Sequence, residues 1–369
     1  MRGRVDNQVS MMCLINPEDV VPDGHPLRKI KQIADEALAS IDEQLEPMYA
    51  ESGRPSIPPE RLLKSMLLMA LYSVRSDRQL CEQIQYNLLF RWFLDMTMTE
   101  KVWDRSTFSH NRDRLIEHDI GRALFGAVVD EAKRRKLMST EHFSVDGTLI
   151  EAYASMKSFR PKDETDSDDD QGTGGGSTGS RSNRWVNFRG KKRSNDTHES
   201  KTDPDARLMR KGYGKEAKLS YSGHILMENR NGLVVDLRIE KATGYAERDA
   251  AIDMLESLGG TKRITVAADR GYDTQDFAAR CRAIRVTPHV AQHTSRRSSI
   301  DERTTRHEGY KASQRIRKRV EEPFGWLKTI GGLRRTRFRG IPRTTFATLL
   351  SVTALNILRI VNLSPPSTA

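Results

Sequence analysis

The stretch FSVDGTLIEA, residues Phe143 to Ala152, places one acidic residue in the middle of an apolar run. The apolar residues around it predict a β-strand. Asp146 interrupts this strand and is followed at once by Gly147. Because Asp is a poor strand former and is costly to bury, its position indicates either a functional carboxylate or a turn residue that hydrogen-bonds to the backbone.

The stretch VAADRGYD shows the same arrangement further along the chain. An apolar run ends at Ala268 and continues directly into Asp269 and Arg270. In α/β sheets the strand ends carry the functional site, and two carboxylates placed there repel each other unless a cation lies between them. Oxygen ligands of this kind suit Mg²⁺. Two such strand ends favour a metal pair over the simpler interpretation of Asp269 as part of a turn with a local ion pair.

The charge of the chain indicates a polyanionic partner. The 369 residues carry a formal net charge of +11, which favours nucleic acid over a membrane surface as the partner. A basic protein without such a partner is the alternative. The three cysteines lie far apart in the sequence, so we expect small buried apolar residues in a reducing cytoplasm, not a disulfide framework or a zinc module.

Neither end of the sequence predicts a membrane segment. The N-terminal residues include acids and form no long apolar run, which argues against a signal peptide. The most apolar C-terminal stretch, Phe346 to Leu363, contains Asn356 and Arg359. Such polar residues are typical of a buried core helix and not of a membrane span.

Residues from about 26 to 135 show helical periodicity. Three helices are expected to begin at caps formed by Ser56, by Ser76 with Gln79 in a capping box, and by Ser106 or Thr107. Three short helices fit both a helix-turn-helix unit and an ordinary bundle. The third helix offers Arg112 and Arg114, side chains of the type that contacts phosphates and base edges.

The pattern changes to that of an α/β domain at about residue 139. Strands expected at residues 217–229 and 233–242 are joined by the turn sequence NRNG, and helices then alternate with strands as far as residue 291. This order predicts a mixed sheet flanked by helices. Acidic and Gly/Ser-rich runs at about residues 160–195 predict a disordered surface insertion.

A strongly basic segment, SQRIRKRVEEPFGWLKTIGGLRRTRFRG at residues 313–340, is the candidate source of a third carboxylate. Arg317 and Glu321 are four residues apart and share one helix face, and Lys328 follows about two turns later on the same side. Pro323 is expected to kink or restart the helix. A helix with this charge would be stabilised by DNA phosphates, although a solvated charged helix is the alternative.

These motifs resemble DDE transposases of the insertion-sequence-five superfamily, which have a ribonuclease-H-like catalytic core. The three acids of that family match Asp146, Asp269 and Glu321. The family spacing of an arginine, three residues, the glutamate, six residues and a lysine is met by Arg317, Glu321 and Lys328. Glu322 does not meet this spacing and is the second choice for the third acid.

One family position differs in this sequence. The tyrosine that accompanies the arginine in the family corresponds to Gln314, and Tyr310 lies one turn earlier. The resemblance also includes the N-terminal helical block and the segment GLRRTRFRG. It therefore extends over nearly the whole chain outside the Gly/Ser-rich insertion.

The resemblance implies a fold, an activity and partners. The fold is a helical N-terminal domain at residues 1–138, for DNA binding or dimerisation, followed by a ribonuclease-H-like mixed α/β domain at residues 139–369. The activity is that of a cytoplasmic, nucleoid-associated transposase that binds terminal inverted repeats, cleaves a DNA strand and joins the 3′-OH to target DNA, as a homodimer and without a membrane partner. The alternatives are an endonuclease without strand transfer and an inactive DNA-binding regulator.

The resemblance also implies roles for individual residues. Two Mg²⁺ or Mn²⁺ ions would be held by Asp146, Asp269 and Glu321, with Asp146 between them. The residues expected to contact DNA are Arg317, Lys328, Trp326, Arg112, Arg114, Arg334, Arg335 and Arg337. Trp326 is expected either to stack on an unpaired base or to belong to the core. Structural or DNA-contact roles, and not catalytic ones, are expected for His198, His224 and His289.

Overall fold

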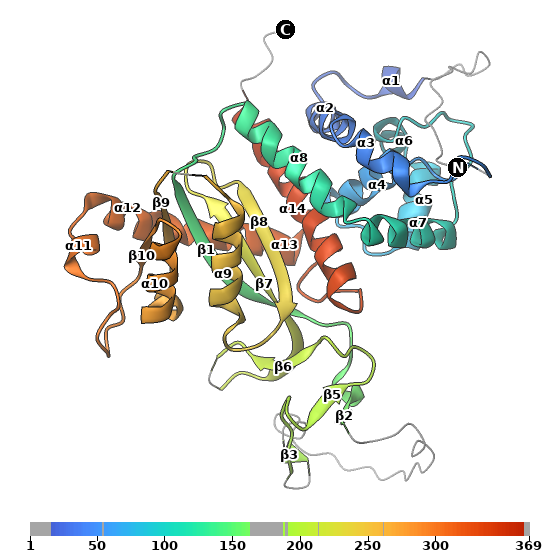
Figure 1. The fold of residues 1–369 in the computed structure, drawn as a ribbon. Coiled ribbons are helices and arrows are strands. Elements are labelled where there is room, and N and C mark those ends of the chain that lie inside the picture. The colour runs from blue at the N-terminus through green and yellow to red at the C-terminus, as the bar shows by residue number, and fades with distance from the viewer. Residues whose placement is uncertain are drawn as a thin grey trace.

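The computed structural model describes residues 16–53, 55–162, 187–188, 191–212, 214–260 and 262–364. Helices form the first part of the chain, as the sequence predicts (Figure 1). Their bounds are α1 (Pro17–Val20), α2 (Pro26–Ala39), α3 (Asp42–Leu45), η1 (Glu46–Met48), α4 (Pro59–Leu71), α5 (Asp77–Tyr86), α6 (Leu88–Phe93), α7 (Arg105–Glu117) and α8 (Ile120–Arg134).

The expected cap at Ser76 is confirmed and the one at Ser56 is wrong. Ser76 Oγ accepts a hydrogen bond of 3.1 Å from the backbone N–H of Gln79, which satisfies one free donor of α5. Ser56 instead donates to the carbonyl of Ile57. Helix α4 begins two residues later than a Ser56 cap requires, because Pro58 and Pro59 start it with prolines that have no N–H to satisfy.

Helix α7 is capped by a residue that precedes the expected one. The Asp104 carboxylate accepts from the backbone N–H groups of Ser106, at 2.7 Å, and Thr107, at 3.1 Å. Ser106 and Thr107 therefore lie inside the first turn instead of capping it. A carboxylate is the stronger acceptor and also interacts favourably with the positive end of the helix dipole.

The second part of the chain is built on a mixed β-sheet, as predicted. Its strands are β1 (His142–Glu151), β6 (Arg207–Arg210), β7 (Ala217–Glu228), β8 (Val234–Lys241), β9 (Ile264–Ala268) and β10 (Val286–Val290). The order is β10-β9-β1-β7, with β6 and β8 both paired to β7. Strand β1 is antiparallel to β7 and parallel to β9, and β9 is parallel to β10. The sheet is therefore mixed, with β1 between the hairpin strands and the parallel pair.

Short elements and helices complete this part of the chain. They are η2 (Met156–Ser158), β2 (Phe159–Pro161), β3 (Asn187–Phe188), β4 (Lys191–Lys192), β5 (His198–Ser200), α9 (Ala246–Ser257), η4 (Arg270–Tyr272), α10 (Gln275–Ala283), α11 (Glu302–Thr305), α12 (Glu308–Ile316), η5 (Arg317–Val320), α13 (Glu321–Thr329) and α14 (Ile341–Leu363). The predicted acidic and Gly/Ser-rich insertion lies largely outside the described residues.

Helices cover both faces of the sheet. On one face α9 and α10 bury apolar side chains against Phe143, Val145 and Leu226. On the other face α13 and α14 pack against Ile150 and Ile225 in a core that continues into the N-terminal helices. Burial of this apolar surface is the main force that holds the layers together.

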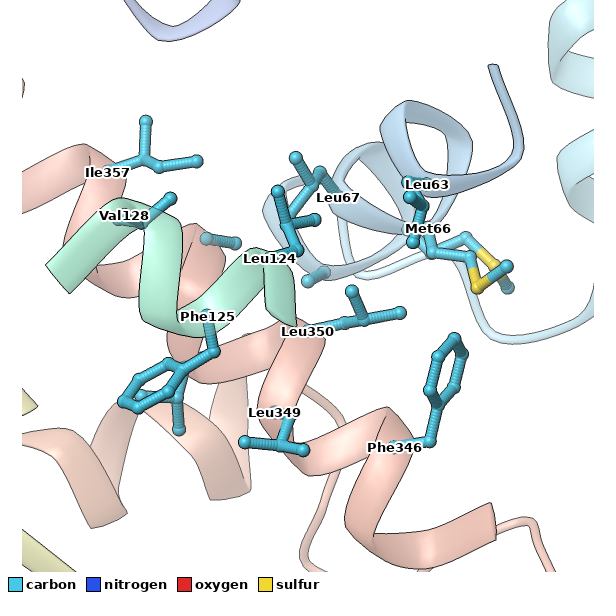
Figure 2. Close-up of a cluster of buried hydrophobic side chains, with 14 of the residues drawn as sticks. Leu63, Met66, Leu67, Leu124, Phe125, Val128, Phe346, Leu349, Leu350 and Ile357 are labelled. Atoms are coloured by element: carbon cyan, nitrogen blue, oxygen red, sulfur yellow. The ribbon is translucent and has the colours of Figure 1, made fainter. Parts of the chain in front are cut away.

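Helix α14 joins the two parts of the chain. Leu349, Leu350 and Phe346 of α14 lie in one cluster with side chains of α4 and α8 (Figure 2). The same helix packs against β8. The expected boundary near residue 138 therefore marks a change of local structure, but the C-terminal helix contributes to the hydrophobic core on both sides of it.

The expectation of a buried C-terminal helix is confirmed. Within the described part of the chain, α14 is the one helix with the length and hydropathy of a membrane span, and 67% of that stretch is buried in the protein. Its Asn356 is buried and bonds the β8 backbone twice, accepting from the N–H of Val234 at 3.0 Å and donating to its carbonyl at 2.8 Å. Asn356 thus satisfies buried backbone groups on the edge of β8 that no other strand pairs.

The helix that contains the third acid restarts where proline was expected to interrupt it. Helix α12 ends at Ile316, one 3₁₀ turn follows, and α13 begins at Glu321. Pro323 lies in the first turn of α13, where its missing N–H costs no helical bond. Of the cysteines, Cys281 is buried as expected and Cys81 is half-buried, while Cys13 lies outside the described residues.

Candidate active site

Asp146 and Asp269 lie side by side on neighbouring strands. The parallel register pairs Ser144 of β1 with Ala267 of β9; Asp146 stands two residues further along β1, and Asp269 directly follows the end of β9. Parallel neighbours are about 4.8 Å apart. Asp146 accepts a 2.8 Å bond from the N–H of Gly147, and Asp269 accepts a 2.7 Å bond from the N–H of Gly271. Each carboxylate is therefore held by a backbone N–H that follows it, and the charge of Asp269 acts on Asp146.

The surroundings of Asp146 make its negative charge costly. Burial is the largest cause and raises the pKa of its carboxyl group to about 6, and the bond from Gly147 opposes this. The carboxylates of Asp269 and Glu247 raise the pKa further, while the Arg317 guanidinium lowers it. A bound divalent cation would remove this repulsion, which is the behaviour expected of a metal site.

Glu247 is a third carboxylate at this place, and the sequence did not reveal it. It is the second residue of α9, and burial and the charge of Asp269 raise the pKa of its carboxyl group. A Cβ added to Gly147 would lie 2.7 Å from Glu247 Oε1 and 3.0 Å from His224 Nδ1. Gly147 thus leaves room for Glu247 on the α9 face of β1, while the neighbouring Asp146 projects from the opposite face of the strand.

Two buried polar side chains lie next to the acids. His224 pairs with Gly147 across β1 and β7 and is fully buried, and neither of its ring nitrogens has a hydrogen-bond partner. Burial lowers the pKa of His224 to about 4. Tyr272 is 1% exposed and its hydroxyl also has no partner. Its pKa is raised, first by burial and then by the charges of Glu247, Asp146 and Asp269. The burial of His224 excludes the DNA contact that the sequence left open.

Glu321 lies near the two aspartates in the fold but its carboxylate does not join them. It is the first residue of α13 and is exposed, while the preceding turn η5 packs against β1. Glu322 bonds to Arg359 of α14 at 3.1 Å, so its side chain is directed to that helix. Among the described residues, no three His, Cys, Asp or Glu side chains converge closely enough to hold a metal ion.

The two basic residues that frame Glu321 do reach the site. Arg317 acts on Asp146, as its effect on the pKa of that carboxyl group shows. Lys328 donates a hydrogen bond from Nζ to Oγ1 of Thr148, two residues after Asp146 on β1. Burial lowers the pKa of Lys328, as do the nearby cations Lys211 and Arg334. A group of positive charges therefore lies beside the acids.

Gln314 occupies the position of the family tyrosine and has a clear role. Its side chain accepts a 3.1 Å bond from Nε of Arg317 and donates to the carbonyl of His289. Gln314 thus orients Arg317. Tyr310 donates instead to the carbonyl of Val290 at the end of β10, at 3.0 Å. Trp326 is half-buried and packs against the main hydrophobic core, in line with the core role.

Arg112 and Arg337, expected at a DNA surface, both pair with Asp77, Arg112 as a buried side chain and Arg337 as one that is 36% exposed. Arg112 lies 2.7 Å from Asp77, and Arg337 approaches the same carboxylate at 3.3 Å. The side chain of Arg112 is 8% exposed and stacks against the ring of Phe338. The Arg112 guanidinium therefore lies inside the helical part of the protein with its Nε unpaired, which argues against the expected DNA contact.

The remaining expected DNA contacts differ in exposure. Arg334 is exposed and lies close enough to Lys328 to lower its pKa. Arg335 donates to the carbonyls of Ala152 and Tyr153, at 3.3 and 2.8 Å. Arg114 is half-buried with its guanidinium 4.9 Å from the ring centre of Tyr49. Arg334 is therefore the best placed of the three for a phosphate.

The other two histidines make structural contacts. His289 Nδ1 lies 2.7 Å from the hydroxyl of Ser313, and burial lowers the pKa of this histidine to about 4. His198 stacks on Phe159 with ring centres 5.5 Å apart. Both contacts agree with the expectation that neither residue is catalytic.

Comparison with known proteins finds matches along both parts of the chain. Residues 15–114 match the family described as "Transposase domain (DUF772)", and residues 139–357 match the family described as "Transposase DDE domain". The three acids and both framing basic residues lie in the second match.

Three solved structures match this chain at low identity and with TM-scores under 0.5. A piggyBac transposase synaptic complex with hairpin DNA is 10% identical over 91% of this chain and 74% of its own, with a TM-score of 0.44. A Mos1 strand transfer complex is 11% identical over 79% and 82% of the two chains, with a TM-score of 0.20. A Mos1 paired-end complex with the left transposon end is 10% identical over 77% and 81%, with a TM-score of 0.21.

Proposed function

Because the chain belongs to the transposase DDE domain family, and is therefore a metal-dependent DNA transposase, we propose that Asp146, Asp269 and Glu321 are its catalytic acids. The observation that supports this assignment is the position of Asp146 in β1 next to the end of the parallel strand β9, where Asp269 follows, so that the charge of Asp269 adds to a repulsion that a cation would relieve. Glu321 enters the assignment through its spacing from Arg317 and Lys328, both of which reach Asp146.

The residues present fit Mg²⁺ or Mn²⁺. They supply carboxylate oxygens and no thiolates, which is the ligand set that these hard ions prefer. Asp146 and Asp269 would hold the cation, and Glu321 would add its carboxylate from the start of α13. When bound, two such ions lower the pKa of an attacking water or 3′-OH and neutralise charge on the leaving oxygen.

The protein's own basic residues would place the DNA backbone. Arg317, oriented by Gln314, and Lys328, bonded to Thr148, would bind phosphates on either side of the scissile bond. Arg334 would extend this contact. Neutralising phosphate charge next to the carboxylates lets DNA approach a site that would otherwise repel it. We further propose that the DNA partners are terminal inverted repeats and a target duplex, and that a homodimer brings two ends together.

The test uses labelled duplexes that carry candidate element ends, incubated with Mg²⁺ or Mn²⁺ and mapped strand by strand. Asp146→Asn, Asp269→Asn and Glu321→Gln should each reduce cleavage roughly a thousandfold or more without loss of DNA binding. Glu322→Gln is the matched control, because Glu322 neighbours Glu321 but bonds to Arg359, and it should cleave at close to the wild-type rate.

The outcomes separate the assignments. Wild-type cleavage by one of the three variants would remove that residue from the catalytic set, and loss of cleavage in Glu322→Gln alone would move the third acid to Glu322. Cleaved ends that are never joined to a second duplex would show an endonuclease without strand transfer. Activity that persists in EDTA would overturn the metal-dependent mechanism.

A further inference from the structure

We propose that a groove between the helical part of the chain and the basic segment after α13 binds an unpaired stretch of a DNA strand. We call it the junction groove, and it is lined by residues from the stretches 66–75, 328–338 and 346–351. This inference rests on the proposed function and deepens it, because it names the form of DNA that is held beside the active site.

The junction groove begins where the active site ends. It has a volume of about 500 Å³, and Lys328 is one of the residues that line it. The same lysine bonds to Thr148, which lies two residues after Asp146 and therefore on the same face of β1. One side chain thus belongs both to the surroundings of the acids and to the groove.

The two walls of the groove are fixed to each other by hydrogen bonds. Ser73, just after α4, donates from Oγ to the carbonyl of Ile330 at 2.9 Å. Arg337 donates to the carbonyl of Arg75 at 3.0 Å. The groove is therefore formed before any ligand arrives, as binding sites usually are.

Positive charge dominates the lining. The described residues that line the groove include six cations and no acid. Burial lowers the pKa of Lys328, and the charges of Lys211 and Arg334 lower it further, so the cations repel one another. Phosphate groups relieve such repulsion. The cations are Arg75, Arg112, Lys328, Arg334, Arg335 and Arg337.

Two of these cations are free to bind a strand, one from each wall. Arg112 and Arg337 are held by Asp77, and we expect no contact with DNA from Arg112. Arg75 and Arg334 are exposed, and their side chains have no carboxylate partner within the part of the chain that the structure describes. A strand that lies between them meets a guanidinium on both sides.

Below the cations the groove is apolar. Its floor includes Met66 of α4 with Phe346 and Leu350 of α14, where the two helices meet (Figure 2). Ile330 lies at the rim with 39% of its surface exposed. Phosphates gain nothing from such a surface, and the bases of a duplex are stacked inside it. Unpaired bases present their apolar faces, so an apolar floor under a cationic rim favours a single strand.

The test measures binding of a labelled oligothymidine of about twelve nucleotides by fluorescence anisotropy, with a blunt duplex measured in parallel. The full-length protein is used in EDTA at several salt concentrations. Arg75→Gln should weaken oligothymidine binding about fivefold and reduce its salt slope by about 0.7, the loss of one phosphate contact. Arg78→Gln is the matched control, because Arg78 is exposed outside the groove and pairs with Glu82, and it should bind like the wild type.

A second variant separates contact with bases from contact with phosphates. Ile330→Gln changes no charge and should weaken oligothymidine binding about fivefold without changing its salt slope or the binding of the duplex. Leu363→Gln is its control, since Leu363 is 38% exposed at the end of α14. Thermal unfolding of Arg75→Gln and Ile330→Gln should match the wild type, because both side chains are exposed.

The results keep this inference apart from the proposed function. Wild-type oligothymidine affinity in Arg75→Gln or in Ile330→Gln would overturn the junction groove as a site for unpaired DNA. Equal weakening of duplex and oligothymidine binding in Ile330→Gln would overturn it as well. The binding is measured in EDTA and does not depend on the catalytic acids. Retained cleavage by Asp146→Asn would therefore overturn the proposed function and leave this result unchanged.

A further measurement needs no variant. An oligothymidine that contains 4-thiothymidine forms covalent links to adjacent side chains when it is irradiated, and mass spectrometry of the digested protein locates them. The links should fall in the stretches 66–75 and 328–338. Links found exclusively in other parts of the chain would contradict the assignment of the groove.

Discussion

Replacement of Arg112 by Met tests whether this arginine stabilises the helical part of the protein or contacts DNA. Arg112 on α7 pairs with Asp77 in the first turn of α5 at 2.7 Å, and its guanidinium carbon lies 5.0 Å from the ring centre of Phe338. The side chains of Arg112 and Asp77 are 8% and 21% exposed. Met keeps much of the volume but removes the charge.

The magnitude follows from the partner that is left behind. Removing one member of a buried ion pair costs about 3–5 kcal/mol, because the other charge stays buried. Arg337 remains 3.3 Å from Asp77 and offsets part of this cost, so we expect Arg112→Met to lower the free energy of unfolding by about 3 kcal/mol. When the Asp77→Asn variant is the starting protein, adding Arg112→Met should lower the free energy of unfolding by about 2 kcal/mol less than it does in the wild type. That difference is the coupling energy of the pair.

The assay is urea unfolding at neutral pH, paired with DNA binding at several salt concentrations. Arg105→Ala is the control, since Arg105 lies exposed on the same helix, and its effect on stability should stay within about 0.5 kcal/mol. Arg112→Met should keep the salt dependence of DNA binding. If Arg112→Met left the stability unchanged and reduced the slope of log binding constant against log salt concentration by about one, the structural role would be refuted. Arg112 would then be assigned to a DNA phosphate contact.

Two further predictions concern stability. Asn356→Leu should lower the free energy of unfolding by about 2–4 kcal/mol, because it leaves the buried backbone N–H and carbonyl of β8 without the partners seen here; a loss under about 1 kcal/mol in urea unfolding would contradict this. Folding lowers the pKa of His289 from an ordinary value near 6.5 to about 4, so its stabilising effect is complete above about pH 6.5 and is lost as the pH falls toward 4. Protonation of His289 in the unfolded chain should therefore cost about 2 kcal/mol between about pH 7.5 and pH 5. The pH dependence of unfolding should shrink by that amount in His289→Gln and stay unchanged in the exposed control His118→Gln, and an equal pH dependence in both variants would show that His289 does not titrate in this way.

The sheet could be predicted well from sequence because its signals are local. Strand periodicity and the turn NRNG placed β7 and β8, and the apolar run before Asp269 placed β9. Register and layer order follow from such patterns once the strands are known. The helix starts were predicted less well. Ser56, Ser106 and Thr107 all have capping side chains, yet prolines and Asp104 determine the actual starts, and the sequence does not say which of several adjacent candidates is used.

The role of α14 could not be predicted from its own sequence. Its apolar residues indicate burial, which is confirmed, but not the identity of the surfaces that it buries. Leu349 and Leu350 pack with helices from the beginning of the chain, and Asn356 bonds to a strand of the sheet. Contacts between segments so far apart leave no local pattern, and the division into domains at residue 138 missed them for that reason.

The same limit explains which site residues the sequence revealed. Asp146 and Asp269 could be found because an acid inside or directly after an apolar strand breaks the local pattern. Glu247 could not, because an acid in the first turn of a helix is what the helix dipole favours in any surface helix. The sequence could not place Arg112 either, since an arginine on a polar helix has the same sequence pattern whether its partner is a phosphate or Asp77. A functional residue can be recognised in a sequence when its residue type is unfavourable for the secondary structure around it, as Asp146 is in a strand. Glu247 suits its position in the helix, and only its effect on the pKa of Asp146 in the folded protein links it with the acids of the site.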